Sequence, residues 1–319
     1  MNESWKSLHE IPDDFGPTAV TIGNFDGVHL GHQRILQSVA RAARARSLCS
    51  VALTFDPHPL KIVAPSLAPK TLTSIRQRVD LIRRQGIDRV AILAFTPELS
   101  QLSPAEFAET VLARKLVARH VVVGADFRFG RKQAGDAEML RSLGERLGFD
   151  VATGGTVLVG GEPVSSTRLR DLVAQGRMVE ARRLLGREFS LQGSIVSGEG
   201  IGSKRTVPTL NLEPESQVLP ADGVYVTVTR HSGQTGHRES ITNVGLRPTF
   251  EGRHRTIETF LLGEMAGPTP NAIELGFLRK IRDERRFPSA QSLREQISVD
   301  IEIAERYFRR LHALSENRP

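Results

Sequence analysis

Residues 18–32 read TAVTIGNFDGVHLGH, a short apolar run followed by three closely spaced glycines and two histidines. The run TAVTIG is typical of a strand buried on both faces of a parallel sheet. The glycines permit a sharp turn, and the helix that follows would point its free amides and positive dipole end at a ligand. His29 and His32 are three residues apart, so they share one side of a helical turn. The stretch predicts a phosphate-binding turn, although a tight turn with two surface histidines has the same pattern.

The first half of the chain alternates strand-like and helix-like stretches. Further strands are predicted at 49–55, 89–95, 119–124 and 150–159, and helices at 32–46, 74–85, 103–115 and 136–147. The third helix has a full start signal, because Ser103 can cap it, Pro104 needs no amide donor and Glu106 can complete a capping box. Residues 1–186 are therefore predicted to form an α/β Rossmann-like domain that binds ligands at the carboxyl ends of its strands.

The second half has a different pattern. Short alternating segments at 189–198, 223–230, 239–245, 255–262 and 272–278 are punctuated by Gly and Pro, which is typical of a β-barrel or sandwich. A long amphipathic helix is predicted at 289–314. We expect residues 187–319 to form an all-β barrel with a C-terminal helix packed against it.

Composition narrows the class of protein. A chain of 319 residues favours two domains, and 39% hydrophobic with 25% charged residues is the balance of a globular protein. No apolar run approaches the roughly 20 residues of a membrane span, and the start of the chain is unlike a signal peptide, so we expect a cytoplasmic protein without a membrane partner. Cys49 is the only cysteine, which excludes an internal disulfide and a cysteine-rich metal site. The net charge of +7 suits nucleic acid or small polyanions such as ATP.

Three more loops are predicted at the same edge of the sheet. TFDPHP (54–59) carries His58, GADFRFGRKQAGD (124–136) offers aromatic faces beside arginines, and VSSTRLR (164–170) opens a helix with hydroxyl groups. Taken singly, the hydroxyl residues are typical helix caps and the phenylalanines typical core residues. Together, these residues are predicted to lie at the same edge of the sheet.

These motifs resemble the FMN adenylyltransferase module of bacterial bifunctional riboflavin kinase/FAD synthetases. The set GNFDGVHLGH, TFDPHP, DFRFG with a later GD, and SSTRLR covers nearly the whole first half. The resemblance implies that the FMN phosphate attacks the α-phosphorus of ATP, which forms FAD and releases pyrophosphate. It assigns His29, His32, Ser166, Thr167 and Arg168 to the ATP phosphates, Gly23, Asn24, Phe25 and Asp26 to the nucleotide loop, and His58, Asp126, Phe127 and Phe129 to the flavin side. Of these, His29, His32 and Arg168 are the expected catalytic residues.

The second half carries its own candidate site in SGEGIGSKRTVPTLNL (197–212). A glycine-rich loop with Gly200, Gly202 and Lys204 can wrap polyphosphate, and Thr209 and Asn211 offer oxygen ligands suited to Mg²⁺. A hairpin loop with surface charge is the alternative. The segment resembles the riboflavin kinase module, together with NVGLRPTF (243–250). The resemblance implies that Glu258, on a later strand, accepts the proton of the riboflavin hydroxyl.

The sequence departs from the kinase pattern in three places. Phe260 replaces the usual histidine, residues 263–272 are shorter than the usual acidic stretch, and the glycine-rich loop lacks the usual arginines and the Leu-Gly-Phe before its proline. The leading hypothesis is a bifunctional enzyme that converts riboflavin to FMN and FMN to FAD with ATP and Mg²⁺. One alternative is an FMN adenylyltransferase with weak or lost kinase activity. Another is a nucleic-acid-binding synthetase-like protein, although the second half lacks a basic-aromatic stripe. We expect ATP and flavins as partners and no nucleic acid; the sequence leaves open whether the chain forms a homo-oligomer.

Overall fold

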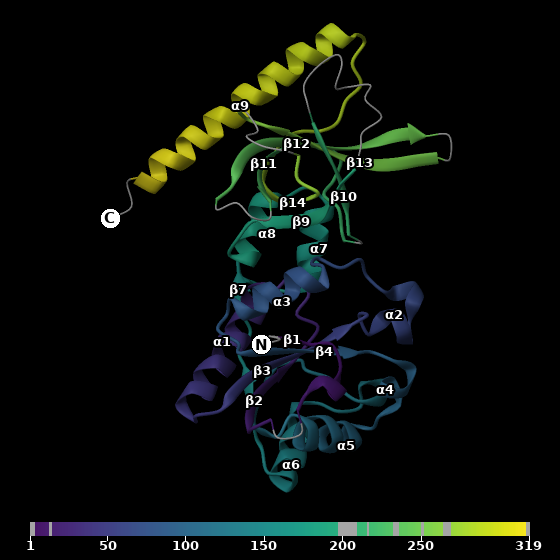
Figure 1. The fold of residues 1–319 in the computed structure, drawn as a ribbon, viewed down its shortest axis with the longest axis vertical. Coiled ribbons are helices and arrows are strands. Elements are labelled where there is room, and N and C mark those ends of the chain that lie inside the picture. Colours follow the sequence, from purple (N-terminus) through teal and green to yellow (C-terminus); the bar gives the residue numbers. More distant parts are fainter. Residues whose placement is uncertain are drawn as a thin grey trace. The chain divides into compact units, whose positions relative to one another are not determined.

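The computed structural model describes residues 4–12, 15–196, 209–215, 217–231, 236–249, 252–263 and 269–316. The chain divides into two compact units, Met1–Ser166 and Thr167–Pro319 (Figure 1). Two helices, α7 (Ser166–Ala174) and α8 (Met178–Leu185), lie between this division and the predicted domain boundary at residue 186. That boundary stays a prediction.

A six-stranded sheet forms the centre of the first unit, with order β1-β4-β3-β2-β5-β6. All neighbouring strands are parallel. The chain fills the sheet from β2 outward to β4, then returns to place β5 on the other side of β2, so the strand order reverses between β2 and β5. Such a switch point is where open α/β sheets bind ligands. The strands are β1 (Ser4–Trp5), β2 (Thr18–Ile22), β3 (Cys49–Asp56), β4 (Arg89–Ala94), β5 (Ala118–Gly124) and β6 (Asp150–Gly154).

Helices cover both faces of this sheet (Figure 1). On one face α1 (Leu30–Ala45) and α3 (Ile75–Arg83) bury Leu36 and Ile82 among the strand residues. On the other, the continuous pair α5 (Pro104–Phe107) and η3 (Ala108–Lys115) packs beside α6 (Ala137–Leu147). The predicted Rossmann-like fold is confirmed, as is the capping box of Ser103 and Glu106. The short elements are η1 (Leu8–Glu10), α2 (Leu60–Val63), η2 (Pro65–Leu67), α4 (Pro97–Gln101), η4 (Arg131–Gln133), β7 (Leu158–Val159) and β8 (Glu162–Pro163).

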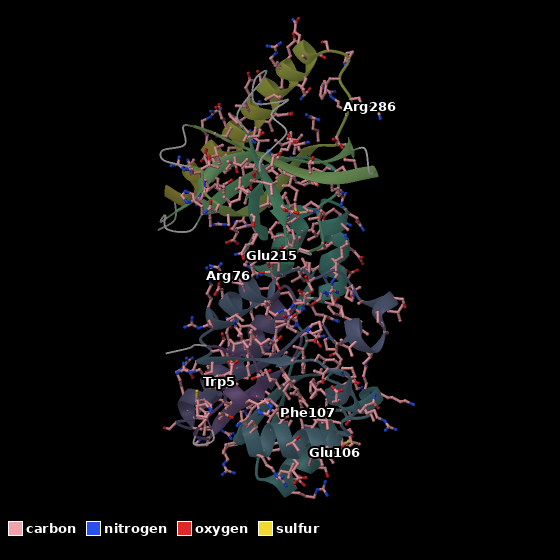
Figure 2. The ribbon with its side chains drawn as sticks, turned by 45° about the vertical axis from the view of Figure 1, so that its right-hand side comes forward. Trp5, Arg76, Glu106, Phe107, Glu215 and Arg286 are labelled. Carbon is pink, nitrogen blue, oxygen red and sulfur yellow. The ribbon has the colours of Figure 1, made fainter. Side chains whose placement is uncertain are left out.

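The edge strand β1 was not expected from the sequence. Trp5 explains it, because its indole is buried in the core and meets Phe15 edge-on with 4.7 Å between ring centroids. Figure 2 labels this side chain. A single tryptophan that buries a large apolar area can hold a two-residue strand that has no periodicity of its own.

The second unit contains a closed barrel of order β10-β13-β12-β11-β14-β9, and the long helix α9 (Ala290–Glu316) follows it. Ala304 and Phe308 of α9 are buried against Val226 and Val228 of the barrel. The barrel and its helix confirm the predicted fold, with β10 as a strand that the sequence did not reveal. The strands are β9 (Phe189–Val196), β10 (Leu210–Pro214), β11 (Gly223–His231), β12 (Arg238–Thr249), β13 (Gly252–Leu261) and β14 (Ala272–Arg282).

A chain of buried hydroxyl groups crosses three neighbouring strands of the barrel. Thr227 Oγ1 lies 2.8 Å from both Ser240 Oγ and Thr242 Oγ1, and the chain continues to Thr229 and Thr259. All five residues are at most 2% exposed. A hydroxyl can donate once and accept twice, so such a chain satisfies its members only while the strands keep this register.

We expect Thr227→Val to lower the free energy of unfolding of the barrel by about 1–2 kcal/mol, since two buried hydroxyls lose a partner. Both tyrosines, Tyr225 and Tyr307, lie in the second unit, whereas the only tryptophan, Trp5, lies in the first. Urea unfolding followed by tyrosine emission therefore reports on the barrel, with Trp5 emission as the internal control. Thr256→Val, outside the hydroxyl chain, is the matched variant. Equal effects of the two substitutions would contradict the expectation.

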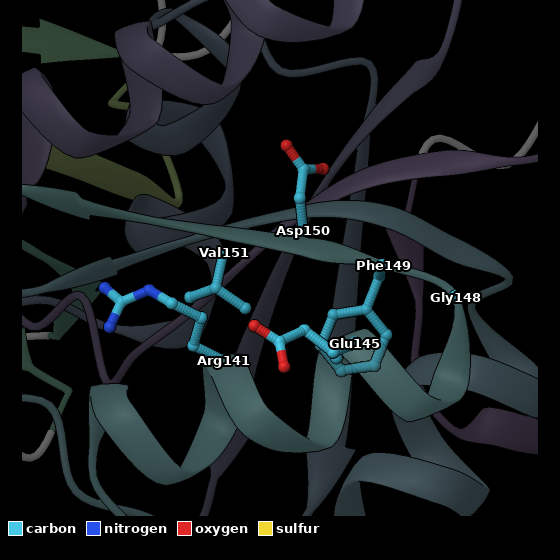
Figure 3. A pocket seen from close by; sticks show the side chains of 7 residues that line it. Arg141, Glu145, Gly148, Phe149, Asp150 and Val151 are labelled. Carbon is cyan, nitrogen blue, oxygen red and sulfur yellow. The ribbon is translucent and has the colours of Figure 1, made fainter.

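A cavity of about 450 Å³ lies between α6 and the start of β6, lined by Arg141, Gly144, Glu145, Gly148, Phe149, Asp150 and Val151 (Figure 3). It is at the amino end of β6, opposite the edge where the motif loops emerge. Figure 3 shows Asp150 pointing away from α6. Its carboxylate instead lies 2.8 Å from Arg46 Nη1 and 3.0 Å from His120 Nδ1. Partial burial raises the pKa of Asp150, but the hydrogen bonds from Arg46 and His120 outweigh burial and lower this pKa below its usual value.

Because the folded pKa of Asp150 is depressed, its stabilising effect is present above the unfolded pKa and lost as the pH falls through the folded one. We expect Asp150→Asn to lower the free energy of unfolding of the first unit at about pH 7, by less than about 1 kcal/mol since the carboxylate is half exposed. The difference should shrink as the pH falls below about 4, the usual pKa of an aspartate, towards the lower folded value. Urea unfolding followed by Trp5 emission over this pH range measures the difference, and a difference independent of pH would refute this role.

Candidate active sites

The first candidate site lies at the carboxyl ends of β2, β3, β5 and β6. These strands are parallel, so the loops that follow them emerge at one edge of the sheet. The loops contain residues 23–29, 57–60, 125–136 and 155–165. They are the four motif-bearing stretches of the first half, and β2 and β5 flank the switch point.

The turn between β2 and α1 has an unusual backbone. Phe25, Gly27 and Val28 have φ angles of 46°, 81° and 40°. Glycine adopts this left-handed region at no steric cost, whereas a β-branched residue such as Val28 is strained there. Strain of this kind persists only where the surrounding contacts over-determine the backbone, and it is commonly found at functional sites.

Asp26 supplies those contacts. Its carboxylate is 1% exposed and accepts hydrogen bonds from the amides of Leu72 and Thr73 at 2.9 and 3.1 Å and from the Thr73 hydroxyl at 3.1 Å. The same Thr73 hydroxyl lies 3.2 Å from the Gly27 amide, which donates to it. The carboxylate of Asp26 therefore faces the protein interior and holds the turn in place. Its backbone carbonyl accepts a hydrogen bond from the Ser166 hydroxyl at 2.9 Å.

His29 and His32 stand together at the start of α1. Their rings stack with 3.7 Å between centroids, and Phe25 meets His32 edge-on. His29 is the N-cap of the helix, and its Nδ1 accepts a hydrogen bond from the His32 amide at 3.3 Å. A neutral imidazole that accepts at Nδ1 carries its proton on Nε2, so that atom is a donor. A Cβ atom on Gly31 would lie 3.1 Å from the His29 ring, which explains the glycine.

The loop after β3 contacts this turn directly. His58 is 8% exposed, and its Nε2 lies 3.3 Å from Nδ2 of Asn24. The Thr54 hydroxyl donates to the Asn24 carbonyl at 3.1 Å. The structure thus joins the predicted nucleotide loop to the predicted flavin loop through Asn24.

The two phenylalanines in the loop after β5 differ in how deeply they are buried. Phe129 is 7% exposed and packs in the core beside Phe107, while Phe127 stacks on it with 5.4 Å between ring centroids and is half-buried. Asp126 is exposed. Burial gives Phe129 a packing role of its own, and the assignment of all three residues to the flavin stays a prediction.

Thr167 and Arg168 follow Ser166 on α7 and belong to the second unit. Their placement at the ATP phosphates stays a prediction.

Arg78 on α3 is a residue of this site that lies outside every predicted motif. It takes a position in the apolar stripe of Ile75, Val79 and Ile82, and it is 3% exposed. One guanidinium nitrogen donates to the Phe55 carbonyl at 3.1 Å, and the other lies 3.8 Å from the Asp26 carboxylate. The available signal was an arginine on the buried face of an amphipathic helix.

The second candidate site is a row of side chains across the barrel. Asn211 on β10 and Asn243 on β12 are both paired with Glu258 on β13, one from each side. Directly paired residues of antiparallel strands share a face and have Cβ atoms about 4.5–5.5 Å apart. Ile257 and Thr259 are fully buried, whereas Glu258 and Phe260 are half-buried on the opposite face.

Part of this second site lies outside the described residues, namely Gly200, Gly202 and Lys204 with Pro208 and Phe250. Thr209 is exposed and directly precedes β10. Within the described part of the chain, no group of three or more His, Cys, Asp or Glu residues could hold a metal ion. Hydroxyl, amide and single carboxylate groups remain as the oxygen donors of this face.

Known proteins match both units. The family model for FAD synthetase matches residues 11–168, and that for riboflavin kinase matches residues 185–308. A bifunctional riboflavin kinase/FMN adenylyltransferase of Buchnera aphidicola subsp. Schizaphis graminum is 33% identical over 95% of this chain and 98% of its own length. The protein of that name from Escherichia coli K12 is 34% identical over 91% and 92%.

A solved structure has the same fold over nearly the whole chain. It is titled as a macrolide-efflux protein from Streptococcus pneumoniae and has a TM-score of 0.84, with 27% identity over 95% of this chain and 98% of that one. In the ranges that the structure describes here, no helix has the length and apolar character needed to cross a membrane.

Proposed function

The chain belongs to the family of bifunctional riboflavin kinase/FMN adenylyltransferases, and from this premise we propose which of its residues carry the two reactions. It is a transferase that phosphorylates riboflavin to FMN and adenylylates FMN to FAD. The observation that carries the first assignment is the stacked pair His29 and His32 at the start of α1, beside the strained turn at the switch point.

In adenylyl transfer, an FMN phosphate oxygen forms a bond to the α-phosphorus of ATP while the bond from that phosphorus to the β-phosphate oxygen breaks. Pyrophosphate leaves with the electron pair. The FMN phosphate is already a nucleophile, so the protein needs to position the reactants and offset negative charge. Nε2 of His29 and the first amides of α1 donate to phosphate oxygens, with His32 beside them. Ser166, Thr167 and Arg168 extend this set, and Gly23, Asn24 and Phe25 line the nucleotide.

In riboflavin phosphorylation, a hydroxyl oxygen of the substrate attacks the γ-phosphorus of ATP and ADP leaves. Glu258 accepts the hydroxyl proton, which requires a carboxylate on an accessible face. Glu258 is only half-buried and lies between Asn211 and Asn243, which supports this role. The donor set also fits Mg²⁺, because Thr209 and Asn211 offer neutral oxygens beside one carboxylate. These residues would hold the ion, whose role when bound is to neutralise phosphate charge.

The substrates of both reactions are small molecules. We propose that the chain works in the cytoplasm on ATP and flavins, with no nucleic-acid partner; its basic charge then attracts ATP. The nucleic-acid-binding alternative has no support among the relatives. A homo-oligomer is not required by either site as assigned.

One assay tests the assignment as a whole. The pure chain is incubated with riboflavin, ATP and Mg²⁺, and FMN and FAD are separated by chromatography. We expect FAD from riboflavin. FAD from supplied FMN alone would favour the alternative in which kinase activity is weak or lost, as the change at Phe260 suggests. No product from either flavin would refute the assignment.

We expect His29→Ala and His32→Ala each to reduce FAD formation from FMN by about 10²–10³-fold, the typical cost of removing a preorganised donor to developing charge. Because His29 also caps α1, His29→Ser is the matched variant that keeps a capping oxygen. Trp5 emission of the same preparations reports whether the first unit folds, and FMN formation from riboflavin, catalysed by the second unit, should be unchanged. Near-normal FAD formation by the alanine variants would contradict the assignment of His29 and His32 to the ATP phosphates.

We expect Glu258→Gln to slow FMN formation from riboflavin by about 10²–10⁴-fold, since the amide cannot accept the hydroxyl proton. FAD formation from supplied FMN should stay unchanged. Glu213→Gln, an exposed carboxylate on β10, is the control. A kinase rate for Glu258→Gln within twofold of the control would exclude Glu258 as the base.

A further inference from the structure

Arg78 is buried where its helix should carry an apolar side chain. The stripe of α3 that faces the sheet contains Ile75, Val79 and Ile82, and Arg78 interrupts it at 3% exposure. A buried guanidinium is costly unless hydrogen bonds and an opposite charge compensate it. Its presence therefore calls for a specific set of partners.

Those partners belong to the loops of the adenylyl transfer site. Arg78 Nη1 donates to the Phe55 carbonyl at 3.1 Å and lies 3.5 Å from Thr54 Oγ1, both at the end of β3. Its Nη2 lies 3.8 Å from Oδ1 of Asp26, the residue that anchors the turn between β2 and α1. One side chain thus contacts the turn before His29 and the strand end that leads to His58.

The two segments also meet beyond Arg78. The Thr54 hydroxyl donates to the Asn24 carbonyl, and Asn24 contacts His58. The planar guanidinium of Arg78 has donors that point in two directions, so it contacts both the end of β3 and Asp26. Lysine has a single ammonium on a flexible stem and cannot reproduce that geometry.

We infer that Arg78 is a positioning residue for adenylyl transfer. Through Asp26 and the end of β3, Arg78 holds the turn of residues 23–29 in place relative to the loop that carries His58. The inference rests on the proposed location of the phosphate site at His29 and His32. Arg78 touches neither substrate. It fixes the relative placement of the two loops that hold the FMN phosphate and the α-phosphorus of ATP.

The role predicts a particular kinetic signature. Loops that still bind their own ligands but are misplaced by a fraction of an ångström keep ground-state affinity and lose alignment. Arg78→Lys should therefore lower kcat for FAD formation by about 10–100-fold with little change in KM for ATP or FMN. FMN formation from riboflavin by the same chain should be unaffected.

Arg76→Lys is the matched control, because Arg76 is exposed on the same helix and Figure 2 labels it. A second variant guards against misfolding: Asp26→Asn combined with Arg78→Met removes both buried charges at once, so neither is left uncompensated. We expect it to fold and to lose kcat no further than Asp26→Asn alone, as residues acting through one another should.

All variants are assayed beside the unchanged chain, so failure of FAD formation itself would be seen separately and would count against the proposed site. The inference is overturned if Arg78→Lys keeps kcat within twofold of Arg76→Lys. It is equally overturned if both activities fall together, which would make Arg78 a general structural residue.

Discussion

The buried carboxylate of Asp26 is the constraint on which the functional edge of the first unit depends. A charge that is 1% exposed must be compensated, and here the amides of Leu72 and Thr73 and the guanidinium of Arg78 do so. These partners lie at or near the start of α3, so the turn after β2 is tied to a segment 46 residues further along the chain. The left-handed conformation of Val28 is tolerated for this reason, and it is this turn that delivers His29 to the N-cap of α1.

In the barrel, the corresponding constraint is a chain of buried hydroxyl groups. Its strands carry threonine and serine inward, and the hydroxyl chain from Thr229 to Thr259 lets these polar groups be buried. Because side chains alternate along a strand, fixing Thr259 inward puts its neighbour Glu258 on the opposite face. A slip by one residue would exchange the two. The interior hydrogen bonds therefore determine which face of β13 can carry chemistry.

Strong local patterns made most of the fold predictable from the sequence. The strands β2 to β5, the helix started by Ser103 and the long helix α9 all have periodicity or caps that few other arrangements would satisfy. β1 and β10 were missed because two residues around Trp5, and five around Asn211, are too short for a periodicity to emerge. The predicted run at 150–159 was too long, since β6 ends at Gly154.

The location of the candidate site in the first unit was predictable from the sequence, but the contacts between its residues were not. A motif places Asp26 near a nucleotide, yet the sequence does not say which way its carboxylate points, and the structure turns it toward Thr73. Helical periodicity places Arg78 on the buried face of α3 but does not identify its partners, which are 52 and 23 positions away along the chain, at Asp26 and Phe55. Long-range compensation of a buried charge leaves no local trace except a residue of the wrong polarity on a buried stripe. A charged residue on a buried apolar stripe therefore indicates a specific partner elsewhere in the chain, because burying the charge without one is costly.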